Sequence, residues 1–186
     1  MRWLFLIFLF SVLTMACIQE ENAKTNFSGN GTNTSDENSV QTIDELAREI
    51  KNAPEDFLYP YDGLSYDTIA VNVESGRVIV KATSEEVPGE DVYMFVYENG
   101  TLVLKSYLLE AIPPSVREQA IAIALSNRTV YENADGHITV RRVLPHTAAK
   151  FYIPKELFSV TWHGDRIVSA LVDLEEGTVV KTYLSG

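Results

Sequence analysis

The 186-residue chain has little of several residue types on which common functions depend. It contains one cysteine, so neither an intramolecular disulfide nor a multi-cysteine metal site can form. Its three histidines, His137, His146 and His163, do not lie at the short spacing typical of a metal-binding pair. The Gly-x-Ser-x-Gly sequence of a nucleophile elbow is absent. We therefore expect no catalytic residue, no cofactor and no metal ligand.

Basic residues are also scarce, because 15 Lys and Arg face 26 Asp and Glu, which gives a net charge of −11. Nucleic-acid binding requires a basic face, so we expect no nucleic-acid partner. The acidic surplus does not form a calcium loop, because Tyr131 and Arg142 occupy the first and twelfth positions, where carboxylates are required. Three acidic pairs are predicted to be solvated residues of turns and loops: Glu85–Glu86, Glu90–Asp91 and Glu175–Glu176.

A short apolar run follows Arg2 at the start of the chain. As a helix, the 14 residues of 3–16 would span about 21 Å at ~1.5 Å per residue, less than a bilayer core of about 30 Å. A basic start and a short apolar centre are typical of an export signal. The end of the run, Leu13–Cys17, resembles a lipobox, which implies lipid attachment at Cys17. The alternative is an uncleaved anchor helix, and both place the remaining chain outside the cytoplasmic membrane.

Residues 17–41 are rich in Asn, Ser, Thr and Glu and predict a disordered tether. Three N-x-Ser/Thr acceptors lie in this segment and two lie further along the chain. The candidate glycosylation sites are Asn26, Asn30, Asn33, Asn99 and Asn127.

The first folded unit is predicted over residues 42–110. Thr42 and Glu45 form a capping box, and apolar residues then recur at helical spacing until Asn52. Alternating β-rich runs predict strands at 68–73, 77–83, 91–98 and 101–108, the last two joined by an Asn-Gly hairpin turn.

The second unit, residues 111–186, has the same order. A capping box at Ser115–Glu118 predicts a helix that ends near Ser126 or Tyr131. Strands are predicted at 137–144, 157–162, 166–174 and 178–184, with a turn at 163–165.

The closing hairpins of the two units can be aligned on their turn glycines, Gly100 and Gly177. The alignment places Phe95 against Val172, and it places Tyr107 against Tyr183 once one extra residue is allowed in the first unit. An extra residue in a strand requires a bulge. The sequence therefore predicts an α+β fold of two helix-plus-antiparallel-meander units, arranged either in one shared sheet or as two small domains.

The second unit resembles a PepSY domain. The resemblance rests on the helix at 117–126, the runs 158–162 and 167–180, and the acidic residues before a glycine turn within 172–180. It implies a cystatin-like helix-on-sheet fold and a role in extracytoplasmic binding or peptidase inhibition, without catalytic residues.

These observations favour a membrane-anchored extracytoplasmic protein that binds or modulates a surface protein or a peptidase. One alternative is an envelope hydrolase or accessory subunit, whose site would assemble from distant segments. Another is a solute-binding lipoprotein, which the lack of strand–helix–strand alternation disfavours. The loop containing Tyr59, Tyr61 and Tyr66 either packs over the end of a sheet or stacks on a sugar or peptide.

Overall fold

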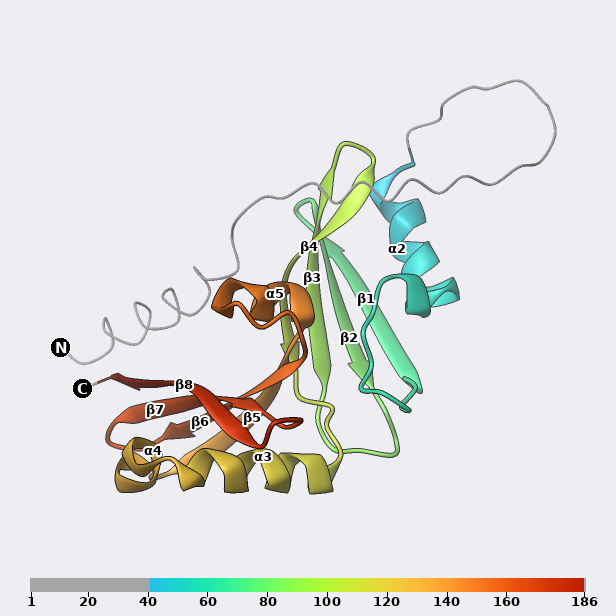
Figure 1. Cartoon of the computed structure of the whole chain (residues 1–186). Coiled ribbons are helices and arrows are strands. Elements are labelled where there is room, and N and C mark those ends of the chain that lie inside the picture. The colour runs from blue at the N-terminus through green and yellow to red at the C-terminus, as the bar shows by residue number, and fades with distance from the viewer. Residues whose placement is uncertain (1–40, 186) are drawn as a thin grey trace.

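The computed structural model describes residues 41–185 and has an α+β fold with two four-stranded antiparallel sheets (Figure 1). The predicted export signal, Cys17, Asn26, Asn30 and Asn33 lie outside the described residues, as does the tether up to residue 40. The first unit contains α2 (Ile43–Asn52), η2 (Pro54–Asp56), β1 (Thr68–Glu74), β2 (Arg77–Thr83), β3 (Asp91–Glu98) and β4 (Thr101–Leu109). The second contains α3 (Pro114–Ser126), α4 (Arg128–Asn133), β5 (His137–Val143), α5 (Pro145–Ala148), η3 (Ala149–Phe151), β6 (Leu157–His163), β7 (Ile167–Asp173) and β8 (Thr178–Ser185).

The two sheets have the same simple order, β1-β2-β3-β4 and β5-β6-β7-β8. The described strands therefore form two separate sheets and not one shared sheet. α2 and α3 each cover one face of the sheet that follows them in sequence, where Ala47 and Ile50 of α2 and Ala120 and Ala124 of α3 are buried. In the second unit, α5 lies on the opposite side of the sheet from α3 (Figure 1).

The start of α2 confirms the predicted capping box. Thr42 Oγ1 accepts a hydrogen bond from the Glu45 N–H at 3.3 Å, and a Glu45 carboxylate oxygen accepts one from the Thr42 N–H at 2.7 Å. Leu46, Ala47 and Ile50 are buried against the first sheet. The helix thus begins and ends where the sequence pattern indicates.

The capping box predicted at Ser115 is wrong. The helix α3 begins at Pro114 with Pro113 as its N-cap residue, and no side chain caps it. Proline is well suited to the first helical turn, because its missing N–H would have no partner there and its φ already fits a helix. Ser115 therefore lies inside the helix, while Asn127 caps the separate helix α4 by accepting from the Val130 N–H at 3.3 Å.

Both closing hairpins contain a β-bulge at the same place. In β3–β4 the register shifts between Met94 and Phe95, so that Lys105 has no partner on β3. In β7–β8 it shifts between Leu171 and Val172, so that Val180 has no partner on β7. The sequence comparison predicted a bulge in the first unit only. The shared position supports the alignment of Phe95 with Val172.

The predicted equivalence of Tyr107 and Tyr183 is wrong by one residue. Tyr107 pairs with Tyr93 of β3, and the residue of β7 that corresponds to Tyr93 is Ala170. Ala170 pairs with Thr182 and not with Tyr183. Eight residues separate Phe95 from its partner Leu104, but only six separate Val172 from its partner Val179, so the first hairpin is two residues longer and not one. The strands beyond the bulge are shorter in the second hairpin, and its longer turn at 174–177 makes up only part of the difference.

We expect Thr42→Ala to lower the free energy of unfolding by about 1 kcal/mol, because it removes the cap of α2. Urea denaturation followed by circular dichroism measures the change. Ser115→Ala is the matched control and should change stability by less than about 0.5 kcal/mol, since Ser115 is exposed and makes no capping bond. Equal effects of the two substitutions would contradict the assignment of the caps.

Candidate functional site

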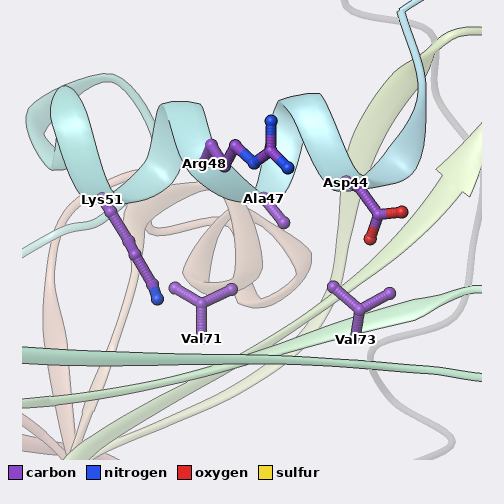
Figure 2. Close-up of a pocket in the computed structure, with 6 residues that line it drawn as sticks. All are labelled: Asp44, Ala47, Arg48, Lys51, Val71 and Val73. Carbon is purple, nitrogen blue, oxygen red and sulfur yellow. The ribbon is translucent and has the colours of Figure 1, made fainter.

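The candidate site is a shallow groove between α2 and the edge strand β1 (Figure 2), with a volume of about 200 Å³. Ala47 lies on the helix side of the groove, and Val71 and Val73 lie on the strand side. The small side chain of Ala47 leaves space above the two valines, and Val73 is 37% exposed. Three charged side chains of α2 complete the lining: Asp44, Arg48 and Lys51.

The strand beside this groove has a free edge. β1 is the first strand of its sheet and pairs only with β2 among the described strands. Thr68, Ala70 and residues 72–74 are exposed. The N–H and C=O groups along the outer edge of β1 are thus open to another strand.

The two basic residues of the groove, Arg48 and Lys51, form no ion pair within residues 41–185. Other basic residues of the described chain, such as Lys81, Lys105 and Arg141, contact a carboxylate at 3.1 Å or less. Together with Asp44, the two basic residues give the groove lining one negative and two positive side chains, in a chain with a net charge of −11. The groove therefore combines an apolar floor with two cations that are open to an acidic ligand.

A buried polar network holds the loop that connects α2 to β1. The Tyr66 hydroxyl donates to an Asp91 carboxylate oxygen at 2.6 Å and lies 2.6 Å from the Tyr93 hydroxyl. Because the Tyr66 proton is engaged by Asp91, the Tyr93 hydroxyl donates to Tyr66 and itself accepts from the Tyr59 N–H at 3.0 Å. The other Asp91 oxygen accepts from the Ala111 N–H at 2.8 Å. The network thus joins the loop, β3 and the linker to the second unit.

Arg142 of β5 extends this network across the two units. Its guanidinium donates to Glu156 at 2.7 Å, to the Tyr59 carbonyl at 2.8 Å and to the Pro60 carbonyl at 3.3 Å, and it lies over the Tyr61 ring. Burial lowers the pKa of Arg142, but the hydrogen bond and charge of Glu156, together with the nearby Asp91 and Tyr93, raise it by more.

The tyrosine loop therefore packs over the end of a sheet, the first of the two predicted alternatives. Tyr66 is part of the buried network, and Tyr61 packs against the core of the second unit. Tyr59 is 46% exposed, and its backbone is held by Tyr93 and Arg142. The loop does not present three free rings to a sugar or peptide.

The acidic residues divide into two kinds. Asp91, predicted as a solvated loop residue, is fully buried as the first residue of β3, because Tyr66 and Ala111 satisfy its oxygens. Glu175 and Glu176 remain in the β7–β8 turn as predicted, where they share Lys155 with Asp173. The sequence alone does not show that Asp91 is buried while the other acidic residues are exposed, because its partners Tyr66 and Ala111 are distant in the sequence.

The structure brings two of the three histidines together. His137 and His163 are cross-strand partners at the ends of β5 and β6, with ring centroids 6.3 Å apart, so His163 belongs to a strand and not to the predicted turn. Burial, Arg141 and His137 lower the pKa of His163. His146 lies on α5 against Tyr107. Pairing the predicted strands 137–144 and 157–162 in antiparallel order places His137 near the end of the second strand, but the exact register that opposes it to His163 comes from the structure.

Two predicted glycosylation sites fall on described residues. Asn99 is exposed in the two-residue turn between β3 and β4, where its φ is positive. Asn127 is partly buried and caps α4.

Comparisons of the chain with protein-family models, with curated proteins and with solved structures find no match. Within residues 41–185, no helix has the length and apolar character needed to cross a membrane.

We expect Arg142→Met to lower the free energy of unfolding by about 3 kcal/mol, the lower end for a broken buried ion pair, because Glu156 keeps some access to water. Chemical denaturation gives the value. Arg128→Met is the control: Arg128 also pairs with a glutamate, but its side chain is 90% exposed, and the loss should stay near 0.5 kcal/mol. If Arg142→Met lowers the free energy of unfolding as little as the control does, the contacts of Arg142 with Glu156, Tyr59 and Pro60 do not stabilise the fold.

Asp91 should titrate above the usual carboxyl pKa of 3.8, because burial raises its pKa more than its hydrogen bonds lower it. The pKa of Asp173 should lie below that value: burial raises it, but the hydrogen bond and charge of Lys155 and the backbone N–H groups of Glu175 and Glu176 together lower it more. The folded state then holds the Asp91 proton to a higher pH than the unfolded chain does. Its contribution to the free energy of unfolding therefore falls as pH rises from 3.8 through the folded pKa. NMR titration of the carboxyl carbons tests this, and the reverse order of the two residues would contradict it.

Proposed function

We propose that residues 42–185 form a non-catalytic binding module that takes an extended segment of another protein along the free edge of β1. The observation that carries this proposal is the placement of an open strand edge beside a groove that has an apolar floor and a charged rim, with two basic side chains and one acidic side chain. An added strand would lie about 4.8 Å from β1 and pair with its free backbone groups.

The groove indicates the side chains that such a segment carries. Alternate residues of an added strand point to the same face of the sheet. Those on the α2 side would contact Val71 and Val73, and acidic ones would reach Arg48 or Lys51. We therefore infer a preference for an extended segment with apolar and acidic side chains on one face.

The size of the groove favours a peptide over an enclosed solute. Pockets that enclose small molecules have volumes of roughly 300–1,000 Å³ and bury most of the ligand. This groove is smaller, about 200 Å³, and open along the strand. A peptide that gains backbone hydrogen bonds from β1 needs no deeper cavity.

The cellular setting of this proposal comes from the sequence. The apolar run at 3–16 and Cys17 support attachment to the extracytoplasmic face of a membrane, through a lipid or an anchor helix. The PepSY resemblance of the second unit supports binding or modulation of a surface protein or peptidase. The tether would let the module reach a partner at some distance from the membrane.

The test is recovery of partners from native membranes with the full-length, C-terminally tagged protein. We expect Arg48→Glu combined with Lys51→Glu to reduce recovery of a stoichiometric partner at least tenfold, because the groove becomes acidic. Arg128→Glu with Arg166→Glu changes the net charge equally at exposed positions away from the groove and should leave recovery unchanged. A synthetic peptide from the recovered partner should bind the wild type and the Arg128→Glu/Arg166→Glu protein with equal affinity and the Arg48→Glu/Lys51→Glu protein at least tenfold more weakly.

Two outcomes would overturn the proposal. Equal loss in both double variants would show a general charge effect and not recognition at the groove. Equal recovery in all three proteins would place the partner elsewhere on the surface.

A further inference from the structure

We propose that His137 and His163 bind one divalent transition-metal ion, such as Zn²⁺, Ni²⁺ or Cu²⁺, across the ends of β5 and β6. The two residues are direct partners in the antiparallel register. Side chains of such partners project from the same face, with Cβ atoms about 4.5–5.5 Å apart. The proposal concerns the second sheet and is independent of the β1 groove.

The ring geometry is close to that of a chelate. The imidazole centroids are 6.3 Å apart and the ring planes differ by 29°. Two nitrogens bound at about 2.0 Å to one tetrahedral ion lie roughly 3.3 Å apart. Rotation of the side chains about their own bonds covers the difference, because both residues are exposed.

Two glycines fix the backbone that carries the pair. A Cβ at Gly136 would lie 2.4 Å from the His163 carbonyl oxygen, and one at Gly164 would lie 2.7 Å from the Asp135 carbonyl oxygen. The segments on either side of the histidines therefore pack backbone against backbone. This close approach holds the two histidines at a fixed separation, which reduces the entropy that metal binding costs.

A neighbouring hydroxyl defines which nitrogen of His163 is free. Thr139 Oγ1 lies 3.1 Å from His163 Nε2. Metal-bound histidines commonly donate their other ring N–H to an oxygen atom, which fixes the tautomer. In the tautomer whose Nε2–H donates to Thr139, Nδ1 keeps a lone pair that can bind a metal ion. Arg141, the cation on the same strand, is paired with Glu110 at 2.7 Å, which offsets its charge.

The site would be open and of moderate affinity. Among the described residues, no group of three or more His, Cys, Asp or Glu could hold a metal ion. Water therefore completes the coordination sphere, as in sites that keep an exchangeable position. Imidazole ligands favour zinc, copper and nickel over calcium or magnesium.

The test is calorimetric titration of the full-length protein with Zn²⁺ and Ni²⁺. We expect His137→Gln and His163→Gln each to weaken the tightest binding event at least tenfold, and His146→Gln to leave it unchanged. Thermal unfolding of each variant checks the fold, which these exposed positions should not disturb. Binding by the wild type no tighter than by the His137→Gln/His163→Gln protein would overturn the proposal.

A spectroscopic measurement distinguishes direct ligation from an indirect effect. With one equivalent of Cu²⁺, the electron paramagnetic resonance spectrum should show coupling to two imidazole nitrogens in the wild type and to one in each single variant. Coupling to two nitrogens in either single variant would also overturn the assignment.

Discussion

The fold depends on one buried cation, Arg142. Its side chain is 4% exposed, and an unpaired charge at such a depth costs several kcal/mol. Its donors are satisfied by Glu156 of its own unit and by two carbonyls of the first unit, those of Tyr59 and Pro60. The two units cannot separate without leaving a guanidinium short of partners. The directional hydrogen bonds of Arg142 therefore fix the relative position of the two units more strictly than apolar contact alone would.

This constraint extends to the groove. The loop held by Arg142 is the segment that joins α2 to β1, and its other end is fixed by the hydrogen bond of Tyr66 to Asp91. With both ends of the loop held, α2 and β1 keep a fixed spacing, and the groove between them exists before any ligand arrives. A preformed groove loses less conformational entropy when it binds a peptide.

The local signals of the sequence predicted most of the fold, because they arise from neighbouring residues. Thr42 and Glu45 cap a helix from three residues apart, and the Asn99–Gly100 turn needs only its own backbone. The main site features depend on partners that are far away in the sequence. Asp91 is buried because Tyr66 lies beside it, and His137 meets His163 through strand register. No local pattern encodes such contacts.

The two units have the same strand order and the same bulge, yet their sheets are covered differently. In β7 every residue except Ile167 is buried, because α5 and η3 cover the face opposite α3. In β3 buried and partly buried residues alternate, as expected for a sheet with a helix on one face. The second sheet is thus the more completely covered, while the first keeps accessible surface beside the short helix α2. This division explains why the groove lies on the first unit.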